Sequence, residues 1–137
     1  MNLQDLITKH EGLRLKPYTD TVGKLTIGVG RNLSDIGISN DEAMMLLSND
    51  IQNVTDELNN NLSWFTNLDP VRQAVLLDMC FNMGWHTLST FTTFLGMVES
   101  GNYSGAAADM LQTKWAKQVG IRAEEDSQMM LTGEWPN

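Results

Sequence analysis

Residues 10–30 read HEGLRLKPYTDTVGKLTIGVG, and the spacing of apolar residues changes within this stretch. Before it, the apolar residues of segment 3–7 fall at helical spacing, and Gly12 stands where helices commonly end. After Gly12 the apolar residues alternate with polar or small ones, as they do in strands. The stretch therefore predicts a short helix that ends at Glu11, followed by a small antiparallel hairpin.

The predicted hairpin covers residues 13–30 and turns at the polar segment 19–24. Successive side chains of a strand point to opposite faces, so the apolar residues of segment 25–29 share one face. Thr26 then points from the opposite face of this second strand.

The rest of the chain has helical spacing. Residues 39–42 form a Ser-x-x-Glu capping box, which predicts a long helix over roughly 40–60. Asp69-Pro70 predicts the start of another helix, because Asp is a good cap and Pro fits the first helical position. Later helices are predicted at 91–100, 104–117 and 120–131. One helix, a small sheet and then four or five helices indicate an α+β fold with two unequal lobes and a cleft between them.

The composition is typical of one soluble globular domain. The chain has 137 residues, 42% of them hydrophobic, and carries 9 Lys and Arg against 17 Asp and Glu, a formal charge of −8. The basic residues form no block, which argues against a nucleic-acid partner. A long uncharged stretch, 79–96, is too polar to cross a bilayer, and the N-terminus lacks the features of a signal peptide. We therefore expect no stable membrane insertion and a protein made in the cytoplasm.

The sequence contains no complete cofactor or metal motif. His10, His86 and Cys80 are too scattered for a metal cluster, and the lone cysteine is expected in the core. The glycines of segment 28–30 follow a strand but do not complete a dinucleotide-binding motif, so they are expected to permit a bend. We expect neither a cofactor nor a metal.

Three residues are candidates for acid–base chemistry. Glu11 is predicted at the C-terminal end of a helix, where the dipole favours the protonated carboxyl that a general acid needs. Asp20 supplies a second carboxylate in the hairpin turn, and the Thr26 hydroxyl can hold a water molecule. Each also has an ordinary interpretation as a surface acid, a turn residue or a strand residue. The residues alone therefore indicate no more than a candidate hydrolase cleft.

The segments 10–18 and 23–30, with Asp20 between them, strongly resemble the catalytic block of phage-type lysozymes, glycoside hydrolase family 24, and most closely the T-even type. The similarity continues over nearly the whole chain, through residues 69–72, 81–84, 91–92, 115 and 133–135. After Leu33 the T-even type has more residues, so the resemblance implies a shortened small lobe here.

The resemblance implies an endolysin, a muramidase that hydrolyses the β-1,4 bond between N-acetylmuramic acid and N-acetylglucosamine in peptidoglycan. Glu11 is then the general acid, while Asp20 and Thr26 position and activate water on the opposite face of the sugar, giving inversion. Two alternatives stay open. One is a lysozyme-like module that binds peptidoglycan without cutting it, and the other is a lytic transglycosylase, against which Asp20 argues.

The resemblance also implies residues that contact the substrate. Arg122 matches a family arginine that faces the catalytic acid and orients its carboxyl. The positions that match sugar-contacting residues of the family, with Arg122 included, are Asn32, Phe81, Asn82, Phe94, Asp109 and Arg122.

The expected organisation is a single lysozyme-like domain, α+β in class, over residues 1–137. It is divided into a small β lobe at 12–38, an interlobe helix at 39–60, and a helical lobe formed by 1–11 and 61–137. We expect a monomer whose partner is the glycan strand of peptidoglycan. It would start in the host bacterial cytoplasm and need a holin to reach the cell wall.

Overall fold

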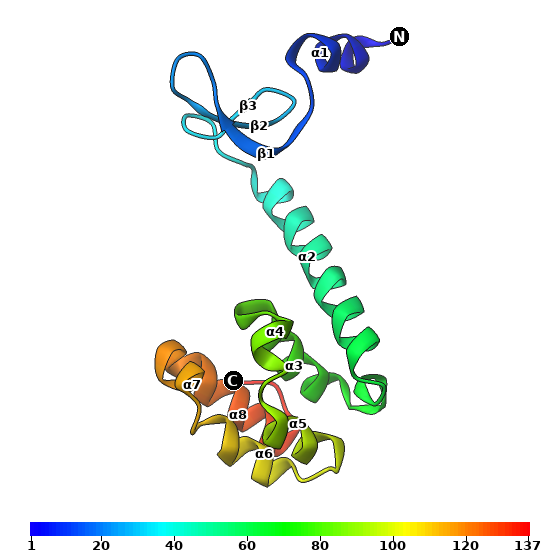
Figure 1. The fold of residues 1–137 in the computed structure, drawn as a ribbon, viewed down its shortest axis with the longest axis vertical. Helices are drawn as coiled ribbons and strands as arrows, with labels where there is room; N and C mark the ends of the chain where they lie inside the picture. The colour runs from blue at the N-terminus through cyan, green and yellow to red at the C-terminus, as the bar shows by residue number, and fades with distance from the viewer. The chain divides into compact units, whose positions relative to one another are not determined.

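The computed structural model describes all residues from Met1 to Asn137. They form two units, Met1–Leu46 and Leu47–Asn137, which we name the N-terminal unit and the C-terminal unit. The division falls within the long helix α2, Asn40–Asn61, whose residues therefore belong to both units. Figure 1 labels the helices and strands of each unit. The fold is α+β and mostly helical, as expected. The assignment of residues 1–11 to the helical lobe stays a prediction.

Helix α1 spans Leu3–Glu11 and has the predicted boundaries. Asn2 caps it, because the Asn2 side chain accepts a hydrogen bond from the Asp5 amide at 2.8 Å, and the Asp5 carboxylate accepts one from the Asn2 amide at 3.1 Å. The helix ends at Gly12, whose φ of 80° is a conformation that glycine adopts readily. The end of α1 thus fixes Glu11 as its last residue.

A three-stranded antiparallel sheet follows, in the order β1-β2-β3. The strands span Arg14–Thr19, Leu25–Gly28 and Arg31–Asn32. The first two form the predicted hairpin, and the third strand was not predicted. Thr26 pairs with Tyr18 of β1 and is only 4% exposed, whereas Leu25 is 44% exposed. The buried residue of the N-terminal unit is therefore a threonine, on the face opposite the apolar side chains.

Helix α2 begins where the capping box predicts. The Ser39 hydroxyl accepts a hydrogen bond from the Glu42 amide at 3.1 Å, and Glu42 Oε1 accepts one from the Ser39 amide at 2.8 Å. Arg31 of β3 donates a hydrogen bond to the same Glu42 oxygen at 2.7 Å. These bonds lower the pKa of Glu42 to about 2, and the bond from Arg31 has the largest effect. The ion pair joins the start of α2 to the sheet.

The C-terminal unit is entirely helical beyond α2. Helix α3 starts at Pro70 as predicted, with the Asp69 side chain accepting a hydrogen bond from the Arg72 amide at 3.1 Å. The helices are η1 Phe65–Asn67, α3 Pro70–Met83, α4 Trp85–Leu88, α5 Thr92–Glu99, α6 Tyr103–Met110, α7 Lys114–Val119 and α8 Ile121–Thr132. Seven α-helices, α2 to α8, follow the sheet, so the expected four or five was too low.

The single helix predicted at 104–117 is wrong, because the chain forms α6 and α7 there. The break lies at Leu111–Thr113. Thr113 has an extended backbone, and its hydroxyl accepts a hydrogen bond from the Ala116 amide at 3.1 Å, which starts a new helix. The break leaves Trp115 on the core side of α7, only 5% exposed.

The hydrophobic core lies in the C-terminal unit, where α8 packs against α3, α6 and α7 and α5 packs against α6 (Figure 1). Its largest fully buried side chains include Phe65, Phe94, Leu58, Leu76 and Met79. Cys80 is buried there, as expected, and burial, with the charge of Glu57, raises the pKa of its thiol to about 11. No helix combines the length and the apolar character that a membrane span requires.

Candidate active site

The carboxyl of Glu11 lies against the turn between β2 and β3. A side-chain carbon at Gly30 would lie 2.9 Å from Glu11 Oε2, so the carboxyl occupies space that glycine leaves open. Gly30 also has a φ of 69°, a conformation that other residues rarely adopt. The Glu11 carboxyl, at the end of α1, therefore lies beside the backbone of this turn. Its side chain is exposed, and a ligand can reach it.

Asp20 lies in the turn that connects β1 to β2. Its Oδ1 accepts hydrogen bonds from the amides of Val22 at 3.0 Å and Lys24 at 2.8 Å. These are the bonds by which aspartate commonly shapes a turn. They use only one carboxylate oxygen, and Oδ2 accepts no hydrogen bond from the protein. The turn thus orients the carboxylate and leaves one oxygen free to accept a hydrogen bond from water.

Thr26 is joined to Asp20 through the backbone of Lys24. The Thr26 hydroxyl donates a hydrogen bond to the Lys24 carbonyl at 3.0 Å, and the Asp20 amide donates to the same carbonyl at 2.9 Å. Because its proton is used in this way, the hydroxyl oxygen remains as an acceptor for water. The structure therefore bonds the Thr26 hydroxyl and the Asp20 amide to the same carbonyl, while Glu11 lies beside Gly30 in the same unit.

Asn32 is the remaining candidate of the N-terminal unit and pairs with Thr26 across β2 and β3. Its amide is occupied by Asp35. Asn32 Nδ2 donates to the Asp35 carboxylate at 3.0 Å, and Asn32 Oδ1 accepts from the Asp35 amide at 3.0 Å. The second Nδ2–H and the second lone pair of Oδ1 remain for a sugar contact.

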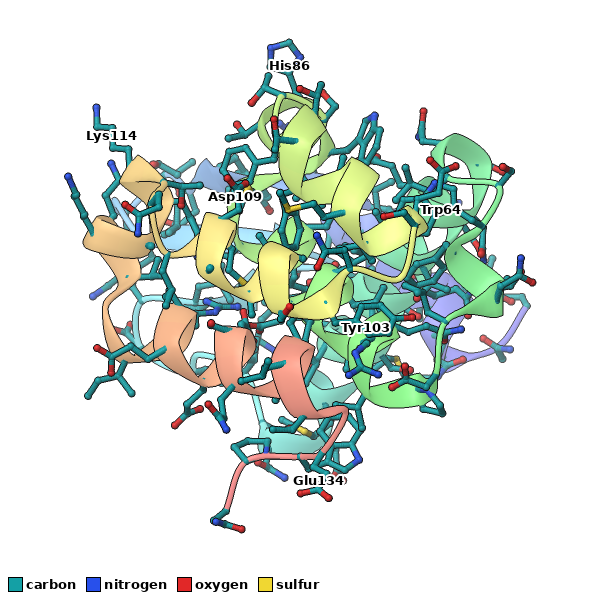
Figure 2. The ribbon with its side chains drawn as sticks, turned by 90° about the horizontal axis from the view of Figure 1, so that it is seen from below. Trp64, His86, Tyr103, Asp109, Lys114 and Glu134 are labelled. Atoms are coloured by element: carbon teal, nitrogen blue, oxygen red, sulfur yellow. The ribbon has the colours of Figure 1, made fainter.

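One of the expected substrate contacts does not fit the structure. Phe94 of α5 has no exposed surface, because its ring fills the core of the C-terminal unit. The expectation that it touches sugar is therefore wrong for this structure. Phe81 of α3 is 44% exposed, and Asp109 at the end of α6 is partly exposed (Figure 2). These two side chains have free surface that a ligand can contact.

Asn82 is held by an aromatic residue of α7. Trp115 Nε1 donates a hydrogen bond to Asn82 Oδ1 at 2.7 Å, which leaves the Asn82 amide group free. Both residues line a pocket of about 360 Å³, as does Lys114. The Lys114 side chain extends outward from α7 (Figure 2). The other lining residues are Met83, Thr87, Phe91 and Gln118.

Arg122 of α8 forms a two-pronged ion pair with Asp78 of α3. Arg122 Nε donates to Asp78 Oδ2 at 3.0 Å, and Arg122 Nη2 donates to Asp78 Oδ1 at 2.7 Å. Such paired bonds fix the plane of a guanidinium. Arg122 Nη1 donates no hydrogen bond within the protein, so one edge of the group remains available.

The Arg122–Asp78 pair lines a pocket of about 490 Å³ in the C-terminal unit. Most of its lining residues are apolar. The apolar lining residues are Leu47, Ile51, Ala74, Leu77, Phe81, Met129, Trp135 and Pro136, and the charged ones are Asp78, Arg122, Glu125 and Asp126.

The sequence analysis missed Asp126, which is 4% exposed and whose Oδ2 has no hydrogen-bond partner. A signal was present in the spacing. Ala123, Met129 and Met130 are all buried, and Asp126 falls on the same helical face. Because aspartate is rarely buried without a partner, an acid on the apolar face of a predicted helix indicates a candidate functional residue.

The sequence matches the phage lysozyme family profile over residues 8–127. The chain belongs to the phage lysozyme family. Its α+β fold agrees with this membership. The lysozyme is thus a glycosidase with peptidoglycan-lytic function. No group of three or more His, Cys, Asp or Glu side chains is arranged to bind a metal ion.

Similar proteins include phage endolysins and probable T4-type lysozymes of Dictyostelium discoideum. An endolysin of Acyrthosiphon pisum secondary endosymbiont phage 1 is 35% identical over 121 residues, 85% of this chain and 80% of the phage protein. The probable T4-type lysozyme 1 of Dictyostelium discoideum is 25% identical over 96% of this chain and 95% of its own length. A SAR-endolysin of Escherichia phage Mu is 30% identical over 80% of this chain and 63% of its own length.

Proposed function

We propose that this lysozyme is an endolysin that hydrolyses the β-1,4 bond between N-acetylmuramic acid and N-acetylglucosamine, with inversion at the anomeric carbon. The observation that carries the proposal is the joined pair of Asp20 and Thr26, which offers a free carboxylate oxygen and a free hydroxyl acceptor. Two such acceptors can hold one water molecule. Hydrolysis requires that water, whereas a transglycosylase does not.

In the proposed mechanism Glu11 donates its proton to the glycosidic oxygen as the bond to the anomeric carbon breaks. Asp20 accepts a proton from the attacking water, whose oxygen joins the anomeric carbon from the opposite face of the ring. Thr26 holds the same water through its hydroxyl oxygen. The products are a new reducing end and a free hydroxyl on the leaving sugar, and the two carboxyl groups exchange their protonation states with solvent afterwards.

Phe81, Asn82, Asp109 and Arg122 remain proposed substrate-binding residues, because each retains a free polar atom or exposed surface. Asn32 is also retained, because its amide keeps one N–H and one lone pair beside the two bonds to Asp35. We further propose that the protein acts as a monomer and reaches the wall after a holin opens the membrane.

The test is the clearing of purified cell walls by wild type, Glu11→Gln and the matched control Glu99→Gln, which makes the same change at an exposed acid of α5. General acid catalysis raises rates by about 10²–10⁴-fold. Glu11→Gln should therefore clear walls at least about 100-fold more slowly than wild type, while Glu99→Gln keeps the wild-type rate. Circular dichroism checks that each variant is folded. A Glu11→Gln rate close to wild type would end the assignment of the acid.

Product analysis tests the rest of the proposal. Mass spectrometry of the released muropeptides should show hydrolysed reducing ends, and NMR of fresh products should show the inverted anomer. Release of 1,6-anhydro ends would indicate a transglycosylase instead. Binding to walls without any released product would indicate a module that does not catalyse.

A further inference from the structure

Asp126 is an acid in surroundings that oppose its charge. It is 4% exposed on α8, and its Oδ2 has no hydrogen-bond partner although it borders the 490 Å³ pocket. Burying an ionised carboxylate without a partner costs several kcal/mol, so such a group takes up a proton instead. The buried position alone therefore favours the neutral acid.

The neighbours of Asp126 strengthen this preference. The charged groups that act on it are Asp78 of α3 and, from its own helix, Arg122 and Glu125. Burial, followed by the hydrogen bond with Asp78 and the negative charge of Asp78, raises the pKa of Asp126. Arg122 acts in the other direction, but its guanidinium is already paired with Asp78. Two adjacent carboxyl groups then share one proton.

Asp78 holds the negative charge of this pair. Burial works to raise its pKa, but the hydrogen bonds from Arg122 and Asp126 and the positive charge of Arg122 hold the pKa of Asp78 below its ordinary value. Asp78 thus receives Nε–H and Nη2–H from Arg122, and a protonated Asp126 can donate its O–H to the same carboxylate. Its backbone carbonyl also accepts from Arg122 Nη2 at 3.3 Å.

We propose that Asp126 and Asp78 act as a proton-sharing pair that positions the guanidinium of Arg122, with its Nη1 edge kept free for substrate. The proposal rests on the proposed function, because Arg122 is a proposed substrate-binding residue. Asp126 is a positioning residue in this arrangement. When Asp126 loses its proton, Asp78 loses a donor and gains a like charge beside it, and Arg122 must divide its hydrogen bonds between two carboxylates.

The first test measures protonation in the full-length protein. Carboxyl carbon NMR of wild type should show Asp126 titrating above neutral pH, well separated from Asp78. Asp78→Asn should move that step down by at least one pH unit, because Asp126 then becomes the only carboxylate beside Arg122. The control Glu124→Gln removes an exposed charge of the same helix and should leave the step in place. An Asp126 step in the ordinary acid range, with the protein folded, would overturn the proposal.

The second measurement follows the Nε–H proton of Arg122, which a purely structural role of Asp126 would not move. The signal should be sharp while the pair shares a proton and should broaden as Asp126 ionises. In Asp126→Asn, which cannot ionise, it should stay sharp to higher pH. A signal that passes unchanged through the titration of Asp126 would show that the pair does not position Arg122.

Wall clearing links the pair to substrate binding. The ratio of the wild-type rate to the Asp126→Asn rate should fall about tenfold one pH unit above the Asp126 step, because only the protonated fraction keeps Arg122 in place. A constant ratio across the step would overturn the link to substrate. If wild type clears no walls at any pH, the proposed function fails, and the two NMR measurements still decide whether the pair exists.

Discussion

Replacing Asp126 by asparagine should change how stability depends on pH. An unfolded aspartate has a pKa of about 3.9, whereas burial and the neighbouring Asp78 raise the pKa of Asp126 in the folded protein. Between these two values the folded state binds one more proton than the unfolded state. The stability that this bound proton contributes is fully present below the pKa of Asp126 in the unfolded protein. It is lost as the pH rises toward the pKa of Asp126 in the folded protein.

The magnitude follows from the linkage relation. One extra bound proton changes the free energy of unfolding by about 1.4 kcal/mol per pH unit, so wild type should lose about 2.7 kcal/mol between pH 5 and pH 7 from this group alone. Asparagine keeps an N–H donor toward Asp78 and has no proton to lose. From pH 5 to pH 7, the free energy of unfolding of Asp126→Asn should therefore rise by about 2.7 kcal/mol relative to that of wild type.

Urea denaturation followed by tryptophan fluorescence at pH 5, 6 and 7 is a suitable assay. All four tryptophans lie in the C-terminal unit, so the signal reports the unit that contains Asp126; they are Trp64, Trp85, Trp115 and Trp135. Glu124→Gln is the control, because it removes an exposed charge from the same helix. Parallel stability curves for wild type and Asp126→Asn would refute the reasoning.

Three further outcomes are expected. Gly30→Ala and Gly28→Ala should each lower the free energy of unfolding by about 1 kcal/mol or more, since both positions have positive φ. Only Gly30→Ala should also lose wall clearing, because only its new side-chain carbon meets Glu11. Equal clearing by both variants would contradict the placement of Glu11. Phe94→Ala should lower the free energy of unfolding by about 3–5 kcal/mol, because the Phe94 ring is fully buried. Phe81→Ala should mainly raise KM, because Phe81 is exposed. A large loss of stability in Phe81→Ala alone would contradict both assignments. Clearing should rise from low to moderate ionic strength as repulsion from the anionic wall is screened over about 8 Å at 0.15 M, and a steady fall with salt would count against this.

The charge responsible for that salt effect is unevenly distributed. The C-terminal unit contains 4 Lys and Arg against 11 Asp and Glu, while the N-terminal unit contains 5 against 6. Almost all of the formal charge of −8 therefore belongs to the C-terminal unit. A variant that neutralises exposed acids there should shift the salt optimum more than the same change in the other unit.

Local signals in the sequence predicted the ends of several elements correctly. Asn2 and Gly12 bound α1, and Ser39 with Glu42 starts α2, because caps act through hydrogen bonds between residues three positions apart. Such contacts are encoded in short segments. The placement of Glu11 at the end of a helix followed directly from them.

Features that depend on tertiary packing were not predicted. The break between α6 and α7 needed the Thr113 cap to compete with a continuous apolar pattern, and the pattern alone favoured one helix. The burial of Thr26 and Asp126 is equally a property of the folded neighbourhood, since neither residue type is commonly buried. The resemblance placed Phe94 at a sugar, but the packing of α5 turns its ring into the core.

The buried Cys80 can report local unfolding of the C-terminal unit, because its thiol reacts only when it becomes exposed. Thiol reagents attack the thiolate, and Cys80 is 3% exposed with a pKa raised to about 11, so the folded molecule presents almost none of the reactive species. Alkylation must therefore wait for the helices around it to separate. The rate at which a maleimide labels this one sulfur would measure how often the C-terminal unit opens, with no engineered cysteine.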